Sequence, residues 1–347
     1  IEGLKPEVVV GLGNLPLWAL AGHWGISNWR GSEMVLANGY KFVPSLTMTS
    51  IQTQWANRAF ALKDWQDRIA RRLRNGFVKP VWDFEIHPTL PSLYHFIDSI
   101  NGDVAADIET SNGKIVCLGL ATSSRKAMCI PFQTADGPYW DPHEYVRVLE
   151  AIDRLVKNKK VNWIGQNWNY DAQYFDQDLY IRAPGDFDTY IGQSVLYPGV
   201  ARDLGFLSSM YCDWHSYWKE DGKDWGNIKD YDKEFIYNCR DCCATWEIKQ
   251  AQKKLLIEAG LLDQFEERMR YSHSVYTMMR QGVIRDPDRT STMIEEVSEA
   301  IQTNELGIAE EAGTPINFDS PKQVSELFYK QFGCTPILKR GTATVTT

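Results

Sequence analysis

The sequence predicts an α/β fold in which a mixed sheet is flanked by helices. The first observation is an N-terminal β-branched run that enters a glycine turn and an apolar segment, the pattern of a strand, a turn and a helix. The second is a meander of apolar segments near the middle of the chain. The third is that long helical patterns follow these strands, which favours a three-layer α/β arrangement.

Residues 1–75 are expected to form a small α/β domain. Its first strand ends at Gly11-Leu-Gly13, and Pro16 lies near the start of the next helix. A short strand at 40–45 and an amphipathic helix at 51–74 should follow. The glycine pair could cradle a phosphate, but we interpret it as a structural turn.

Residues 76–100 are expected to be a linker, because prolines are frequent there, with a short helix at 93–100. Asn112-Gly113 then predicts a hairpin turn between two strands. Strands are expected at 104–109, 114–122, 126–132 and 161–165. Helices are expected at 142–156, 170–180, 187–196, 233–259, 266–281, 286–313 and 321–332, with a loop at 211–230.

Composition limits the class of protein. A chain of 347 residues is long enough for two or three domains, and its charged content of 24% is typical of globular proteins. The net charge of −8 argues weakly against nucleic-acid binding but does not exclude it, because local basic patches matter more than the sum. Seven scattered cysteines, no apolar run of membrane length and no signal peptide indicate a cytoplasmic protein. The start at Ile1 suggests an excised piece.

Two carboxylates stand at the end of one predicted strand. Asp107 and Glu109 are two residues apart, so they share a face of the strand and repel each other. A divalent cation is a natural counter-charge. Asp171 follows a later strand, and Asp241 lies four residues after Tyr237, on the same face of a predicted helix.

Four acids from three segments could hold two Mg²⁺ ions about 3.5–4 Å apart, the arrangement used for in-line phosphoryl displacement. Tyr237 could orient the attacking water, and Asn167 could hold the backbone or the substrate. Each signal alone has a simpler reading. Asp171 suits a helix N-terminus, and Asp241 suits a solvated face. The order of all three segments is far more specific than any one of them.

Three segments together resemble the 3′–5′ exonuclease domain of the DEDDy type, over roughly residues 100–255. They are Asp107-Ile-Glu-Thr110, Ile164-Gly-Gln-Asn167-Trp-Asn-Tyr170-Asp171 and Tyr237-Asn-Cys-Arg-Asp241. The resemblance implies an RNase H-like fold with a mixed five-stranded sheet, at residues 101–258. It also implies two Mg²⁺ ions, for which Mn²⁺ could substitute.

The resemblance also assigns roles. Asp107, Glu109 and Asp241 would bind the first ion, and Asp107 with an outer-sphere Asp171 the second. Tyr237, with Glu109, would position the nucleophilic water.

Substrate contacts are expected near the second motif. Thr110 and Asn167 match family positions that contact the terminal nucleotide. Tyr170 flanks the motif and is a candidate for stacking or positioning the substrate.

The C-terminal part is similar to family A DNA polymerases. The stretch from Tyr276 to Asp286 looks like the segment that joins exonuclease to thumb, and 316–328 resembles a stretch near the thumb. The tail from Lys339 to Thr347 resembles the loop that follows. Residues 259–347 would be the truncated, helical start of a thumb. No palm or fingers motif is present, so the chain would be the front part of such a polymerase, and its fused N-terminal domain suggests a phage-like one.

The N-terminal part resembles half of a uracil-DNA glycosylase-like domain. Val8-Val-Val-Gly-Leu-Gly-Asn14, Trp29-Arg-Gly-Ser32 and Lys41-Phe-Val-Pro-Ser45 carry the likeness. The family has a His-containing catalytic loop after the last of these strands, where this chain has Leu46-Thr-Met-Thr49. The segment should therefore be degenerate and should lack glycosylase activity.

The predicted function is proofreading hydrolysis of a single-stranded DNA 3′ end to nucleoside monophosphates. The remaining polymerase domains and a replisome protein are the expected partners. The cytoplasm of a host is the expected location if a phage encodes the chain. A non-catalytic scaffold and an RNase D-like RNA exonuclease are the alternatives.

Ligand types and spacing also allow a structural zinc at Cys212, His215, Cys239 and Cys242. The alternative is that the helix cysteines are small apolar side chains that pack one helix face.

Overall fold

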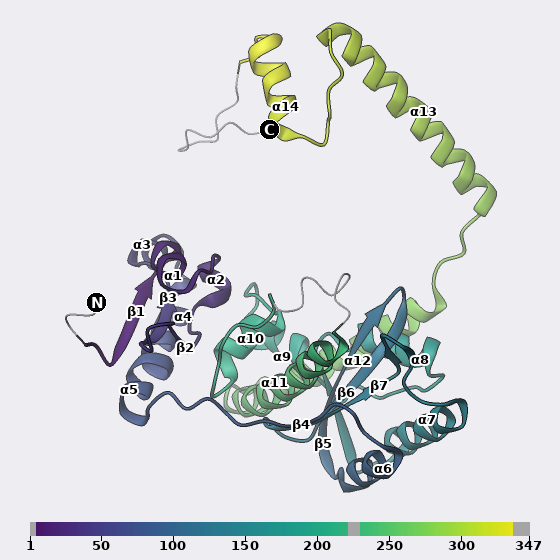
Figure 1. The fold of residues 1–347 in the computed structure, drawn as a ribbon. Helices are drawn as coiled ribbons and strands as arrows, with labels where there is room; N and C mark the ends of the chain where they lie inside the picture. The colour runs from purple at the N-terminus through teal and green to yellow at the C-terminus, as the bar shows by residue number, and fades with distance from the viewer. Residues whose placement is uncertain (1–4, 221–229, 336–347) are drawn as a thin grey trace. The chain divides into compact units, whose positions relative to one another are not determined.

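The computed structural model describes residues 5–220 and 230–335 and divides into two compact units, residues 1–280 and 281–347 (Figure 1). Within the described residues, no helix is both long enough and apolar enough to cross a bilayer.

The first unit contains a six-stranded mixed sheet with the order β11-β10-β5-β6-β7-β4. Its strands are β4 (Asp83–Glu85), β5 (Gly102–Ser111), β6 (Lys114–Ala121), β7 (Lys126–Pro131), β10 (Val161–Gly165) and β11 (Phe187–Asp188). The central meander is antiparallel, while β10 runs parallel to β5 and β11 to β10. This confirms the predicted α/β fold. Asn112 and Gly113 both have positive φ, as the predicted hairpin turn requires.

The sheet has one strand more than the five expected. The additional strand, β4, pairs in parallel with β7 and lies in the stretch expected to be a linker. A helix, α6 (Leu90–Ser99), also lies there and begins with a capping box at Thr89. Residues 76–100 therefore contribute to the sheet and its covering layer.

Helices cover both faces of this sheet (Figure 1). Side chains of α6, α7 and α8 pack on one face, and side chains of α11 and α12 pack on the other. The helices of this part are α7 (Pro142–Lys157), α8 (Asn169–Asp178), α9 (Thr189–Leu196), α10 (Leu204–Tyr211), α11 (Tyr231–Glu258) and α12 (Leu262–Gln281). Two short strands, β8 (Gln133–Thr134) and β9 (Gly137–Pro138), form a separate hairpin. The layers follow the alternation of β5, because Ala106 and Ile108 face α6–α8 while Ala105 faces α11.

α12 was expected to begin the thumb, but it packs on the sheet unit. Phe265 and Met269 are buried with the side chains of α11. Tyr276 donates a hydrogen bond to the carbonyl of Ala172, at 3.1 Å. The compact unit accordingly extends to Arg280.

The N-terminal part has a small sheet in the order β1-β3-β2, with parallel β1 and β3. Its elements are β1 (Val8–Leu12), α1 (Asn14–Ala21), α2 (Ile26–Trp29), β2 (Met34–Val35), β3 (Lys41–Ser45), α3 (Met48–Thr53), α4 (Asn57–Lys63), the π-helical segment η2 (Asp64–Ala70) and α5 (Arg71–Asn75). The single helix expected at 51–74 is therefore broken, and extended backbone at Gln54 ends its first piece. The likeness to glycosylase-like domains stays a prediction.

Arginines of the N-terminal part hold the segment that follows α10. Arg68 donates to the carbonyls of Ser209, Cys212 and Asp213, at 3.0, 2.7 and 2.6 Å. Arg72 also donates to the Asp213 carbonyl, at 2.7 Å. Residues 212–220 form neither helix nor strand, as the expected loop at 211–230 requires, and residues 221–229 lie outside the described residues.

The second unit is helical. Its described residues, 281–335, contain α13 (Pro287–Ala312), α14 (Pro321–Ser325) and the π-helical segment η4 (Glu326–Gln331). Ser320 caps α14 and Pro321 stands in its first turn, as predicted. The thumb-like loop expected at 339–347 lies outside the described residues.

Gly119 allows α11 to approach the sheet closely. It pairs in register with Asp107 across β5 and β6. A Cβ atom on Gly119 would lie 2.2 Å from Asn238 Oδ1 and 2.6 Å from Cys242 Sγ. Asn238 in turn donates to the carbonyl and carboxylate of Asp107, at 3.1 and 3.2 Å.

We therefore expect Gly119→Ala to lower the free energy of unfolding of the first unit by about 1–3 kcal/mol, because the methyl group would overpack this contact. Urea unfolding followed by circular dichroism would measure it. Gly307→Ala, in α13 of the second unit, is the control for adding a methyl group in open space: its Cβ would meet no atom within 4 Å, so it should not lower stability. An equal free energy of unfolding for Gly119→Ala and wild type would contradict this, because it would show that α11 can move away from the methyl group without destabilising the unit.

Candidate active site

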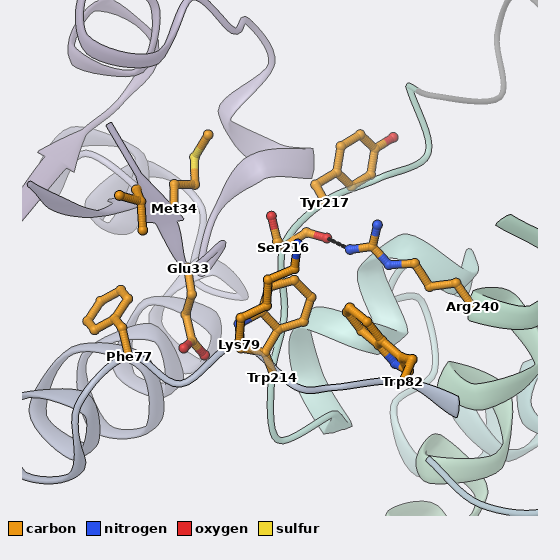
Figure 2. Close-up of a pocket in the computed structure, with 10 residues that line it drawn as sticks. Glu33, Met34, Phe77, Lys79, Trp82, Trp214, Ser216, Tyr217 and Arg240 are labelled. Atoms are coloured by element: carbon orange, nitrogen blue, oxygen red, sulfur yellow. Dashed lines mark hydrogen bonds between the residues drawn. The ribbon is translucent and has the colours of Figure 1, made fainter. Parts of the chain in front are cut away.

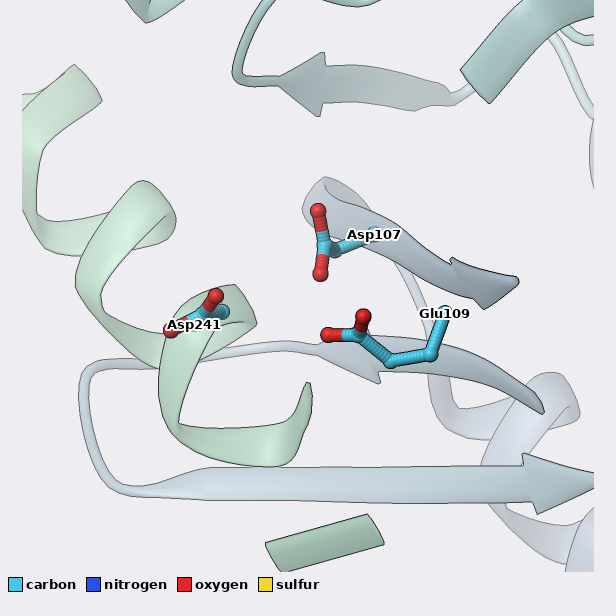
Figure 3. Close-up of side chains that lie close together, drawn as sticks. All are labelled: Asp107, Glu109 and Asp241. Carbon is cyan, nitrogen blue, oxygen red and sulfur yellow. The ribbon is translucent and has the colours of Figure 1, made fainter. Parts of the chain in front are cut away.

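The predicted acids of the first and third motifs meet between β5 and α11 (Figure 3). Asp107, Glu109 and Asp241 each offer a carboxylate oxygen, and these oxygens lie within 4.8 Å of one another. Asp107 and Glu109 reach this place because they lie two apart on the face of β5 that α11 covers. The strand register shifts between Glu109 and Thr110, so the sheet is irregular next to the acids.

This concentration of negative charge raises the pKa values of two of the acids. Burial, and then repulsion by Asp241, raises the pKa of Asp107 to about 7. Burial, and then repulsion by Asp107 and Asp241, raises the pKa of Glu109 well above its usual value. A bound cation would remove this repulsion, so the three carboxylates fit a hard divalent ion such as Mg²⁺.

Asp171 lies outside this group of three but close to it. From α8, its carboxylate accepts a hydrogen bond from the backbone N–H of Ile108, at 3.1 Å. Burial, and then repulsion by Asp107, raises the pKa of Asp171 well above its usual value. Its expected outer-sphere role stays a prediction.

Tyr237 lies one helical turn before Asp241, as predicted. Its hydroxyl accepts a hydrogen bond from Lys219 Nζ, at 2.8 Å. Burial, and then the charge of Asp241, raises the pKa of the Tyr237 phenol. The side chain therefore stays protonated at neutral pH and can donate a hydrogen bond.

Two residues that we did not predict contact Asp241. Trp218 Nε1 donates to Asp241 Oδ1 at 2.7 Å, and Lys219 Nζ donates to Asp241 Oδ2. Both precede the long helix in an irregular segment, where no periodic pattern marks them. The neighbouring Trp218 and Lys219 were the only sequence feature that could have indicated this contact. Whether they reach Asp241 depends on how the segment folds against α11.

The expected substrate residues lie in two places. Thr110 and Tyr170 are together, with 3.1 Å between their hydroxyl oxygens. Asn167 has a positive φ of 60°, and its N–H donates to Asp188 at 2.9 Å. Their contact with a nucleotide stays a prediction.

Asn167 lines a hollow of about 700 Å³. Arg202 also lines it and stacks on Tyr190, with 4.2 Å from the guanidinium carbon to the ring centroid. Arg202 was not predicted, because a single arginine after a glycine-containing turn carries no specific signal.

A second hollow, of about 430 Å³, has an aromatic and cationic lining (Figure 2). The Arg240 guanidinium lies 5.5 Å from the ring centroids of both Trp82 and Trp214 and donates to the Ser216 carbonyl at 2.9 Å. None of the predicted carboxylates lines it. The acids therefore form a site separate from this hollow.

The structure does not bring the four expected zinc ligands together. Among the described residues, the group close enough to hold a metal consists of Asp107, Glu109 and Asp241. His215 Nδ1 is 3.1 Å from Ser208 Oγ, and the Cys212 thiol contacts the Ala244 carbonyl at 3.8 Å. Cys239 and Cys242 instead pack against the sheet, as the simpler alternative held.

Comparison with known proteins agrees with this geometry. The family model of the 3′–5′ exonuclease of DNA polymerase A matches residues 90–257. DNA polymerase I of Bacillus subtilis (strain 168) is 25% identical over 253 residues, 69% of this chain and 28% of that protein. DNA polymerase I of Borreliella burgdorferi is 22% identical over 232 residues, 65% of this chain and 25% of that protein. The chain thus spans about a quarter of the length of these relatives.

Solved structures are also similar. Brucella melitensis NrnC is 15% identical, with a TM-score of 0.45, over 58% of this chain and 94% of that one. The POL domain of Pol1 from M. smegmatis is 14% identical, with a TM-score of 0.49, over 76% of this chain and 43% of that one.

The layered fold and the family match define a 3′–5′ exonuclease domain with an RNase H-like fold. More particularly, residues 90–257 match the exonuclease domain of family A DNA polymerases.

His215 provides a test of how the segment beside the site is buried. Burial, and then the charges of nearby arginines, lowers the pKa of His215 well below its usual value. An unfolded histidine takes up a proton below about pH 6.5, whereas the folded one does not. The free energy of unfolding should therefore fall as the pH falls below about 7.

We expect the free energy of unfolding of wild type to fall between pH 7.5 and 5 relative to His215→Asn, by up to about 1.4 kcal/mol per pH unit. Urea titrations at both pH values would measure this difference. His95→Asn, at an exposed position, is the control. The same pH dependence in wild type and His215→Asn would contradict the buried, neutral histidine.

Proposed function

We propose that this chain removes nucleoside monophosphates from the 3′ end of single-stranded DNA, by hydrolysis with two divalent cations. The observation that carries the proposal is the group of three carboxylates within 4.8 Å at the junction of β5 and α11. It lies within a domain that the exonuclease family model matches.

The chemistry of these donors supports the metal assignment. Asp107, Glu109 and Asp241 would hold one cation, and Asp107 with an outer-sphere Asp171 the other. Bound Mg²⁺ or Mn²⁺ supplies Lewis-acid stabilisation of charge during in-line phosphoryl displacement. Burial, and then repulsion by Asp241, raises the pKa of Asp107 to about 7, and bound cations would offset that repulsion.

The protein's own groups would orient the water. The protonated Tyr237 hydroxyl can donate a hydrogen bond to the water, while a Glu109 carboxylate oxygen accepts one from it. Lys219 holds the Tyr237 oxygen from another side. These contacts restrict the direction of attack.

The 3′ end of the DNA would bind beside the acids. Thr110 and Tyr170 form a hydroxyl pair that can contact the terminal sugar, and Tyr170 is exposed enough to stack on a base. Asn167 and Arg202 line the hollow of about 700 Å³, where the guanidinium can contact a phosphate.

The role in proofreading is inferred from the relatives, which are named DNA polymerase I. The partners we propose are palm and fingers domains and a replisome protein, in the cytoplasm. The expected phage origin remains part of this proposal, and so does a thumb role, now limited to the second unit, residues 281–347.

Asp107→Ala should lower the rate of 3′ hydrolysis by on the order of 10³-fold, because it removes the acid assigned to both cations. Tyr237→Phe should lower kcat by about 10²-fold with little change in KM, because the ring stays while the hydroxyl loses its contacts with the water and with Lys219. A 3′-labelled oligonucleotide with Mg²⁺ would measure both rates. Asp153→Asn, at the surface, is the control. Activity that persists in EDTA or in Asp107→Ala would contradict the proposal.

We expect kcat/KM for a DNA strand to exceed that for the same RNA sequence by at least about tenfold, an order typical of modest substrate discrimination. The competing function is an RNase D-like exonuclease, since RNA differs at each sugar by a 2′-hydroxyl. Faster hydrolysis of RNA would favour that function. Hydrolysis of neither strand would favour a binding scaffold.

A further inference from the structure

Lys219 brings a positive charge into the group of acids. Its side chain is 25% exposed, and it lies between α10 and α11. The ammonium donates to Asp241 Oδ2 and, at 2.8 Å, to the Tyr237 hydroxyl. It also lies 4.6 Å from the centroid of the Tyr237 ring.

Both oxygens of Asp241 already accept hydrogen bonds from the protein. Oδ1 accepts from Trp218 Nε1 at 2.7 Å, and Oδ2 accepts from Lys219. A divalent cation that binds Asp241 would therefore meet a second positive charge on the same carboxylate. Like charges at such distances repel strongly in a partly buried site.

The Lys219 ammonium can also move away from Asp241. The lysine stem has four flexible carbons, so a change of side-chain rotamer can separate Nζ from Asp241. The Tyr237 hydroxyl remains as a partner. Metal-free and metal-bound states can thus differ by one lysine contact without a change in the backbone.

We propose that Lys219 is an internal counter-cation of this site, which holds Asp241 in the metal-free protein and is displaced from it when a divalent cation binds. The inference rests on the proposed function, because it takes Asp241 as a metal ligand. Lys219 is a positioning residue in this scheme. It weakens cation binding and stabilises the acids while no cation is present.

Calorimetric titration with Mn²⁺ tests the proposal on the full chain, after treatment with EDTA and dialysis. Lys219→Met should bind Mn²⁺ at least about tenfold more tightly than wild type, because the competing charge is gone. Lys219→Arg retains the charge and should stay within about twofold of wild type. Lys114→Met, which removes another lysine paired with an aspartate, should not alter binding. Equal affinity of Lys219→Met and wild type would overturn the proposal.

Thermal melting separates this role from simple packing. In EDTA, Lys219→Met should melt below wild type, because the acids lose their counter-charge. In saturating Mn²⁺ the difference should close. A lysine that only packs would lower the melting temperature equally in both conditions, and that result would also overturn the proposal.

Lys219→Gln carries the same expectations if Lys219→Met does not fold. Acetylation of wild type, read by mass spectrometry, needs no substitution. Labelling of Lys219 should rise when Mn²⁺ is added, since displacement exposes the amine, and unchanged labelling would contradict displacement.

Asp107→Ala distinguishes this inference from the proposed function. If wild type binds Mn²⁺ and Asp107→Ala does not, the cation site stands, and the Lys219 variants alone decide the inference. If wild type and Asp107→Ala bind Mn²⁺ equally, or neither binds it, both the cation site and the inference fail.

Discussion

Repulsion among buried carboxylates is the constraint on which the rest of this structure depends. Oxygens of three acids lie within 4.8 Å of one another between β5 and α11. A fourth acid, Asp171, is close enough to Asp107 to add to the repulsion. Such a group is stable only with compensation from neighbouring donors. Asn238 and Trp218 provide hydrogen bonds, and Lys219 provides a charge. The close approach of α11 at Gly119 brings the Asn238 amide within hydrogen-bonding distance of Asp107.

The compensation has a source far away in the sequence. Trp218 and Lys219 belong to a segment without helix or strand, so the segment needs support from outside. Arg68 and Arg72 supply that support through hydrogen bonds to backbone carbonyls. Glu33 offsets part of their charge, because it lies 2.9 Å from Arg72 and 3.5 Å from Arg68. The buried arginines of the N-terminal part thus hold the segment whose lysine, Lys219, forms an ion pair with Asp241.

Local spacing predicted that Asp107 and Glu109 share a strand face and that Tyr237 and Asp241 share a helix face, whereas the order of the motifs and the family resemblance predicted that the two pairs meet. The central meander was predicted from its apolar runs and the hairpin from the Asn112-Gly113 turn. β4 was missed because a three-residue strand among prolines has no period. The position of α12 was missed because an amphipathic pattern does not say which surface Phe265 and Met269 will cover. Lys219 was missed because its partners are set by tertiary contacts alone.

The parallel pairing of β4 with β7 affects how this domain can be separated from its neighbours. The family match begins at residue 90, but β4 ends at Glu85 and completes one edge of the sheet. A protein cut at the boundary of the match would expose the backbone of β7, and unpaired edges promote association between chains. A cut before β4 would still remove the arginines that hold residues 209–213. The smallest fragment that keeps the whole sheet and the support of residues 209–213 is therefore larger than residues 90–257, the part that the family model matches.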